Sequence, residues 1–210
     1  MLFFSDGEPA YLTKRFDVLP DGQKLAQEDF ASLTGKNEAT HGTNYKYTGT
    51  YEDIACKIKQ YVKAWQIETA RFYTLIIFNY LFANDDAHLK NFSLRQTIDG
   101  DYILTPAYDL VNTSLHIDEG GFTLQDGLSK QIEKSDIYEK KGHPCQTDFI
   151  RFGLQIGLSH NIIAKIIKPF LNEQAKVYEL ITNSFLDEKL KRMYRKSYTE
   201  RLDRFRRASS

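Results

Sequence analysis

The chain has 210 residues, of which 41% are hydrophobic and 13% aromatic, and its 28 basic and 28 acidic residues give a formal net charge of zero. This length allows one large domain or two small ones, and the apolar content is sufficient for a packed core. A neutral chain has no overall attraction for nucleic acid, and two cysteines are too few for a disulfide framework. The apolar run at residues 75–83 is too short to span a bilayer, so we expect a cytoplasmic protein with no membrane contact.

The first part of the chain predicts short elements followed by one clear helix. We expect a short strand at residues 9–16, a short helix at residues 27–33 and a polar loop at residues 35–49. Thr50 is suited to a helix N-cap, because its hydroxyl can accept a hydrogen bond from the first helical turn. The helix that follows is predicted for residues 51–65, where apolar side chains recur on one face.

A buried helix and a hairpin are predicted at the centre of the sequence. Residues 70–83 (ARFYTLIIFNYLFA) are apolar on nearly every side, which is typical of a helix without a solvent face. The sequence Asn84-Asp85-Asp86 favours a turn at its end. Asp99-Gly100 lies between apolar segments at residues 92–94 and 102–104, and an Asp-Gly pair in that setting predicts a hairpin.

The remainder of the chain is predicted to be irregular at residues 111–147 and then helical. Apolar residues recur at helical spacing in residues 148–156, 160–168 and 172–185. The expected fold class is therefore mainly α (α+β), with one short β-hairpin beside a cluster of polar residues.

Three of those polar residues give the strongest functional signal. Asp86 is followed five residues later by Asn91, and a second carboxylate, Asp109, comes after the hairpin. The same Asp-to-Asn spacing occurs in the catalytic loop of protein kinases, where the Asp orients the attacking hydroxyl. Mg²⁺ commonly binds one or two carboxylates together with substrate phosphates and water. The pattern predicts phosphoryl transfer, with Asp86 as base and with Asn91 and Asp109 as Mg²⁺ ligands; a solvated turn after a helix is the less favoured alternative.

Longer motifs resemble one kinase family. Residues 86–93 contain Asp-x-His-x-Lys-Asn-Phe-Ser, and residues 104–109 contain Leu-Thr-Pro-x-Tyr-Asp. With the upstream segments Arg15-Phe16-Asp17 and Gln27-Glu28-Asp29-Phe30, they resemble the HipA-like serine/threonine kinases, the toxins of bacterial toxin–antitoxin pairs. The matching motifs lie between residues 11 and 110. The resemblance implies the helical C-terminal lobe of a protein-kinase-like fold, with ATP and Mg²⁺ as cofactors.

The resemblance also implies roles for residues inside these motifs. His88 and Lys90 are catalytic candidates that would stabilise charge on the moving phosphoryl group. A hydrogen-bonded structural histidine and a solvated lysine are the equally open alternatives. Tyr108 resembles the residue that packs on adenine, and a plain core aromatic is its alternative.

Nucleotide contacts are also implied upstream, in the hinge-like segment. Lys14 and Phe16 are expected to contact adenine through backbone groups, so that their side chains matter little. Asp17 and Gln27 are weaker candidates for ribose contact, and for these two the preferred interpretation is an ordinary surface or turn position.

Members of this family carry an N-terminal lobe before the hinge, with a phosphate-covering loop and a lysine on a strand. Residues 1–10 contain neither. We therefore expect residues 1–50 to be a remnant of the N-lobe and hinge region and residues 51–210 to be the helical lobe, with the chain a fragment or its missing lobe supplied by a companion chain. The resemblance also implies a protein substrate, such as an aminoacyl-tRNA synthetase or another translation factor, and a DNA-binding antitoxin as partner.

Two alternatives to a kinase stay open. The first is a catalytically idle interaction module that binds an antitoxin or another partner chain. The second is a metal-dependent phosphohydrolase that uses Asp85, Asp86, His88 and Asp109, with His116 as the nearest additional ligand. The sequence lacks the further His and Asp clusters that a two-metal site requires.

The C-terminal end is basic. Between Lys189 and Ser210, nine lysines and arginines against two acids give a charge of +7, so residues 1–188 carry −7. Contact with DNA phosphates is one interpretation. The favoured interpretation is a solvated helical tail that packs on the body through Leu190, Met193, Tyr194 and Leu202.

Overall fold

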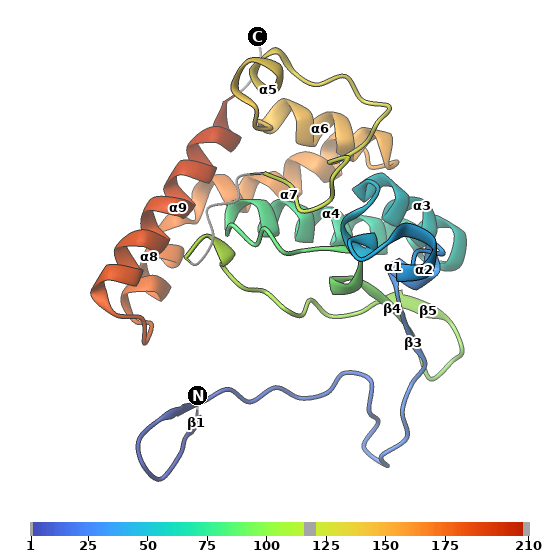
Figure 1. The fold of residues 1–210 in the computed structure, drawn as a ribbon, viewed down its shortest axis with the longest axis horizontal. Helices are drawn as coiled ribbons and strands as arrows, with labels where there is room; N and C mark the ends of the chain where they lie inside the picture. Colours follow the sequence, from blue (N-terminus) through green and yellow to red (C-terminus); the bar gives the residue numbers. More distant parts are fainter. Residues whose placement is uncertain (1, 116–120, 208–210) are drawn as a thin grey trace.

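The computed structural model describes residues 2–115 and 121–207, and helix α4 (Trp65–Leu81) lies at its centre (Figure 1). Phe72, Tyr73 and Ile77 of this helix are fully buried. The prediction of a buried central helix at residues 70–83 is therefore confirmed. The helix ends at Leu81, and Ala83 then adopts a left-handed backbone with φ of 52° that turns the chain into the polar motif.

Helix α3 (Tyr51–Tyr61) packs beside α4, and Thr50 caps it as predicted. The Thr50 hydroxyl accepts the Asp53 N–H at 3.1 Å, and the Asp53 carboxylate accepts the Thr50 N–H at 2.9 Å, so two end donors are satisfied reciprocally. The expected extension of this helix to residue 65 is wrong. Val62 has an extended backbone, with φ −107° and ψ 122°, and its buried side chain enters the core from a turn.

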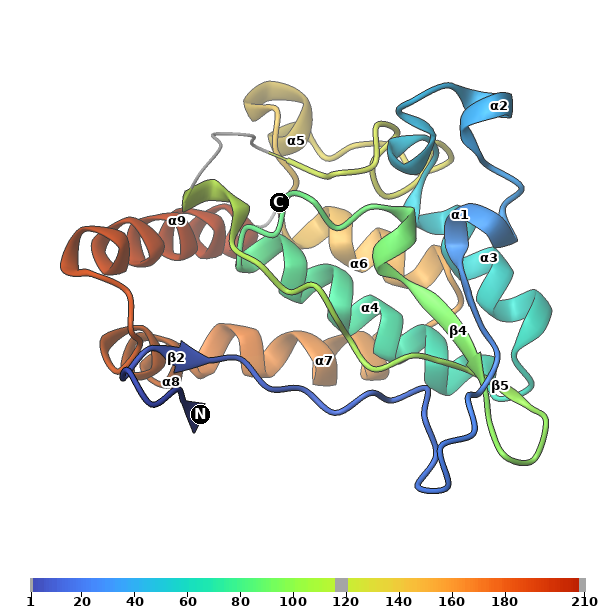
Figure 2. The same cartoon turned by 60° about the horizontal axis from the view of Figure 1, so that its bottom comes forward.

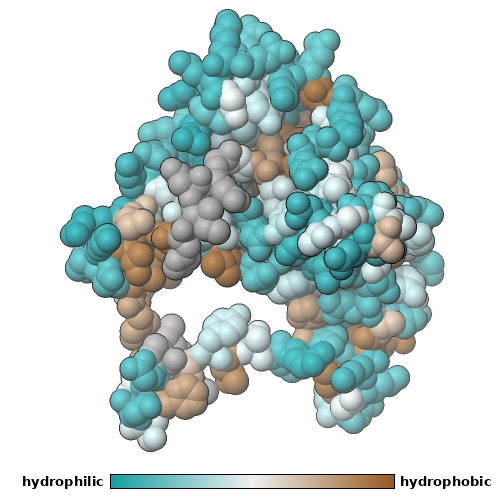
Figure 3. Space-filling model, viewed as in Figure 1, coloured by the Kyte–Doolittle hydropathy of each residue, from teal (hydrophilic) through white to brown (hydrophobic). Residues whose placement is uncertain are grey.

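The N-terminal residues form a thin arm outside the helical body (Figure 2). Strand β1 (Leu2–Phe3) pairs with β2 (Pro9–Ala10), and the Phe3 ring contacts Phe185 at 5.5 Å. The strand expected at residues 9–16 stops at Ala10, because β1 offers only two residues for pairing. Beyond it, Tyr11 and Leu12 are 92% and 76% exposed, and open space separates this part of the arm from the body (Figure 3).

A three-stranded antiparallel sheet, in the order β3-β4-β5, stands beside the α3 end of the body. Strands β4 (Ser93–Gln96) and β5 (Tyr102–Leu104) confirm the predicted hairpin, and Gly100 takes the positive φ of 82° that its turn requires. The helix expected at residues 27–33 is a strand in its first half. These residues form β3 (Gln27–Asp29), which pairs with β4, and then the short helix α1 (Phe30–Leu33).

The shorter elements around this framework are α2 (Glu38–His41) and the 3-10 helices η1 (Tyr45–Tyr47), η2 (Leu89–Asn91) and η3 (Thr113–Leu115). The second half of the chain is helical, with α5 (Asp136–Lys141), α6 (Gln146–Gln155), α7 (His160–Asn172), α8 (Gln174–Thr182) and α9 (Glu188–Arg206). Helices α6, α7 and α8 confirm the three predicted there. The prediction that residues 111–147 are irregular is wrong in part, because the described part of this range holds η3, α5 and the start of α6.

Helix α9 is more than a solvated tail. Tyr198, Leu202 and Phe205 are buried, and the Phe205 ring contacts Phe149 of α6 at 5.1 Å. Packing through Leu202 was expected, whereas Met193 is exposed. Across residues 2–115 and 121–207, no helix combines the length and the apolar character needed to cross a membrane.

Candidate active site

The predicted motif lies in the loop between α4 and β4, and most of its polar side chains are buried. Asn84, Asp85, His88 and Asn91 are all less exposed than Asp86, while the Lys90 side chain is in solvent. A tight turn shapes the loop, because the His88 N–H donates to the Asp86 carbonyl at 2.8 Å. The sequence places these residues after a rigid helix, and the structure holds their side chains in fixed positions.

Asp109 returns to this loop from the far side of the hairpin. The Asn91 side-chain amide donates to Asp109 Oδ2, and the Asn84 amide donates to the Asp109 carbonyl at 3.1 Å. Asn91 Oδ1 accepts the His88 N–H at 3.2 Å. Asp109 itself has φ of 54°, a left-handed conformation that an Asp tolerates better than most residues. The structure thus brings Asn91 and Asp109 together, as the sequence predicted.

Asp86 joins the same group through a residue that sequence reasoning missed. The Tyr47 hydroxyl donates to Asp86 Oδ1 at 2.9 Å, and the Tyr47 ring meets the His88 ring edge-on with centroids 5.3 Å apart. Lys46 Nζ lies 4.9 Å from the Tyr47 ring centroid. The only sequence signal was the Tyr-Lys-Tyr run inside a stretch predicted to be a polar loop.

The surroundings of His88 disfavour the charged form of its imidazole. Burial lowers the pKa of its imidazole, the nearby Lys46 charge lowers it further, and Asp86 acts in the opposite direction. Its Nδ1 accepts the Lys90 N–H at 3.3 Å, which places the proton of the neutral ring on Nε2. Both observations favour the structural role of His88 over a cationic one at neutral pH.

Tyr108 ties the hairpin to the motif loop. Its hydroxyl donates to the Lys90 carbonyl at 2.8 Å and lies 2.6 Å from Ser93 Oγ, and burial raises the pKa of this phenol. Its ring faces Phe16 of the arm, with centroids 6.0 Å apart. Phe16 and Tyr108 are therefore neighbours.

The other predicted nucleotide-contact residues stand apart. Lys14 is exposed on the arm, Asp17 hydrogen-bonds the Arg15 guanidinium, and Gln27 is exposed on β3 opposite Arg95. In the described ranges, no hydrogen bond or ring contact joins these three side chains to the group around Asp86.

Asp85 is engaged in a buried ion pair, and this weighs against the phosphohydrolase. Arg201 of α9 donates to both Asp85 oxygens, at 2.9 and 2.6 Å, and its guanidinium lies 5.1 Å from the Tyr80 ring centroid. The residues with described positions hold no group of three or more His, Cys, Asp and Glu side chains that could bind a metal ion, and His116 lies outside them. From the sequence, Arg201 is only one of the nine basic residues of the C-terminal end.

The donor set of Asn91 and Asp109 fits Mg²⁺ bound together with phosphates. One amide oxygen and one exposed carboxylate are hard ligands, and Mg²⁺ usually takes its remaining ligands from phosphate and water. The Asn91 oxygen accepts the His88 N–H while the amide nitrogen faces Asp109, so the amide would have to rotate to turn its oxygen toward an ion beside Asp109.

Comparison with known proteins identifies the family. The model of the HipA-like C-terminal domain matches residues 1–178. The chain belongs to this family. A protein of Haemophilus influenzae named "Putative kinase" is 29% identical over 214 residues, which cover 93% of this chain and 60% of that protein. The chain thus spans less than two thirds of that relative.

Solved structures share the fold at low sequence identity. HipA of Shewanella oneidensis, determined in a toxin–antitoxin complex with HipB and operator DNA, has a TM-score of 0.61 and 21% identity. That match covers 91% of this chain and 47% of HipA. The Helicobacter pylori proinflammatory kinase CtkA has a TM-score of 0.53 and 15% identity, with 86% and 68% of the two chains covered. The helical, protein-kinase-like fold inferred from the motifs is confirmed.

Proposed function

We propose that this chain supplies the base and the metal ligands for ATP-dependent phosphorylation of protein serine or threonine residues. The observation that carries the proposal is the contact chain Asp86–Tyr47–His88–Asn91–Asp109, which gathers the three motif residues from two separate segments. Family membership supports a kinase-type function in general.

In this mechanism Asp86 accepts a hydrogen bond from the acceptor hydroxyl and takes its proton as the oxygen attacks the γ-phosphorus. The bond between that phosphorus and the ADP oxygen breaks, and the proton passes on to solvent. Asn91 and Asp109 would hold Mg²⁺, which when bound neutralises phosphate charge. Tyr108 would pack on the adenine, and the neighbouring Phe16, with Lys14, would contact it through backbone groups.

We propose that residues 1–50 form a hinge segment with a remnant of the N-lobe, that residues 51–210 form the helical lobe, and that the phosphate-covering loop and strand lysine come from polypeptide outside this sequence. The partial coverage of the relatives supports the proposal of further polypeptide outside this sequence. By analogy with the HipA complex, we propose a DNA-binding antitoxin as partner and a cytoplasmic location. The substrate class proposed is a translation factor.

Replacement of Asp86 by Asn tests the proposal. With the N-terminal lobe supplied as a second polypeptide, Asp86→Asn should abolish transfer of labelled phosphate from ATP to protein while circular dichroism stays unchanged. Asp99→Asn, at an exposed turn of the hairpin, is the matched control and should keep full activity. Retained transfer in Asp86→Asn would remove this carboxylate from the mechanism, and the idle interaction module would then be the better description.

A further inference from the structure

Tyr47 lies outside every motif that predicted the site, yet it is the side chain that contacts the candidate base. We propose that Tyr47 is a positioning residue, whose hydroxyl holds Asp86 Oδ1 so that the second carboxylate oxygen is left for the acceptor hydroxyl. This inference rests on the proposed function. Among the residues with described positions, no group hydrogen-bonds Asp86 Oδ2, so the carboxylate has one occupied and one available oxygen.

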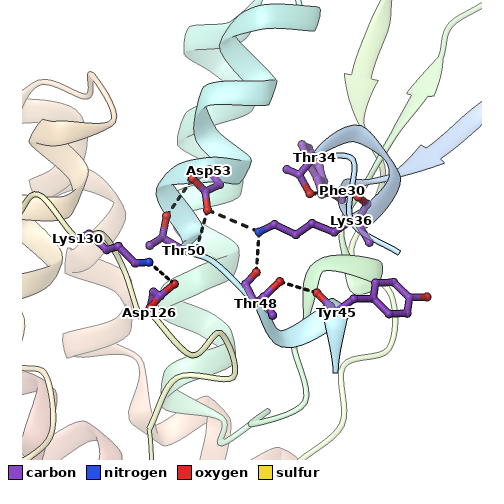
Figure 4. Close-up of polar contacts among 10 residues, drawn as sticks. Phe30, Thr34, Lys36, Tyr45, Thr48, Thr50, Asp53, Asp126 and Lys130 are labelled. Carbon is purple, nitrogen blue, oxygen red and sulfur yellow. Dashed lines mark hydrogen bonds and ion pairs between the residues drawn. The ribbon is translucent and has the colours of Figure 1, made fainter. Parts of the chain in front are cut away.

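Hydrogen bonds hold the backbone around Tyr47 from two directions, and Figure 4 shows the contacts on the Lys36 side. Lys36 Nζ donates to the Thr48 carbonyl at 2.8 Å and lies 3.9 Å from the Asp53 carboxylate, which belongs to the cap of α3. From the other direction, the Gln125 N–H donates to the Tyr47 carbonyl at 2.9 Å. These contacts fix the Tyr47 backbone relative to the helical body.

Gly49 allows this close packing. It has φ of 94°, and a Cβ built there would lie 2.3 Å from Lys36 Nζ, so a side chain would displace the lysine that holds Thr48. The sequence therefore provides both the lysine and the space that it needs.

The Tyr47 hydroxyl is a donor throughout the neutral range. Burial raises the pKa of the phenol, and the hydrogen bond to Asp86 acts in the same direction, against the Lys46 charge. A carboxylate that accepts a hydrogen bond from a phenol cannot rotate freely. Small misplacements of a reacting group lower the rate of the reaction strongly. The edge-on contact with His88 fixes the ring itself.

The test compares Tyr47→Phe with Tyr45→Phe in the kinase completed by its N-terminal lobe. Tyr45 lies in the same 3-10 helix and is also half-buried, but its hydroxyl points away from the contacts in Figure 4 and has no hydrogen-bond partner among the described residues. A hydrogen bond to a charged group corresponds to about tenfold to hundredfold in rate. We expect kcat of Tyr47→Phe to fall by about that factor with the KM for ATP unchanged, and Tyr45→Phe to match the unaltered protein.

An NMR titration of the 210-residue chain, with ¹³C-labelled tyrosine, provides a readout that needs no activity. Asp86→Ala should lower the pKa of Tyr47, because the phenol loses its carboxylate acceptor. An inactive unaltered protein with this NMR response would refute the proposed function and leave the contact established. An unchanged kcat in an active Tyr47→Phe protein would overturn the positioning role, and so would an increased kcat, which would mean that the phenol blocks the acceptor position.

Discussion

Breaking the buried ion pair between Asp85 and Arg201 should strongly destabilise the whole domain. Their side chains are only 5% and 6% exposed, and two charge-assisted hydrogen bonds join them. Removal of one partner from a buried pair leaves an uncompensated charge and costs about 3–5 kcal/mol. We therefore expect Arg201→Met to lower the free energy of unfolding by about that amount.

Urea unfolding followed by circular dichroism measures this change, and a thermal scan gives a second reading. For a chain of this length each kcal/mol shifts the melting temperature by about 2–4 °C, so the expected loss is roughly 6–20 °C. The double variant Asp85→Asn/Arg201→Met should recover part of the loss, because the buried charge is gone. Arg192→Met, at an exposed position of the same helix, is the control and should stay within about 0.5 kcal/mol of the unaltered protein. A loss below about 1 kcal/mol in Arg201→Met would refute the argument from burial.

Two further predictions concern the nucleotide and the pH. In calorimetric titration, the 210-residue chain should bind Mg²⁺–ATP with a millimolar or weaker Kd. The reason is that two or three charge-assisted phosphate contacts, each worth about 1.5–3 kcal/mol, are proposed to come from the N-terminal lobe. Micromolar binding would show that the lobe is dispensable. Burial holds the folded pKa of His88 below its ordinary value, so the unfolded chain takes up the proton first as the pH falls. The stabilising contribution is present above the unfolded pKa of about 6.5 and should be lost as the pH falls from there through the lower folded pKa. Urea unfolding at several pH values should show a weaker acid dependence in His88→Asn, with His143, whose pKa burial also lowers, accounting for part of the remainder; an identical dependence would contradict a lowered pKa.

The sequence predicted the parts of the structure that local chemistry determines. Thr50 and Asp53 form a capping box within one helical turn, and Asp99-Gly100 encodes a tight hairpin turn. The apolar faces of α4 likewise identify a buried helix without knowledge of its neighbours. The return of Asp109 to Asn91 followed from the hairpin, because a hairpin of known length restricts where the next residues lie.

Contacts between distant segments could not be predicted in this way. Tyr47 and Asp86 are 39 residues apart, and Asp85 and Arg201 are 116 apart, and no local pattern encodes either pair. Arg201 was counted with exposed cations, because composition does not distinguish a solvated arginine from a buried one. The strand at Gln27–Asp29 was missed for a related reason, since its backbone conformation is set by pairing with β4 and not by its own residues.

Because of helix α9, the segment that must fold as one unit extends beyond the end of the family model. The family model stops at residue 178, yet the buried arginine that neutralises Asp85, next to the candidate base, comes from residue 201. A protein cut at the family boundary would retain every motif residue and lose the counter-charge beneath the motif loop. The presence of the motif in a relative therefore does not by itself indicate an intact loop. The relative must also have a C-terminal helix that supplies the buried arginine.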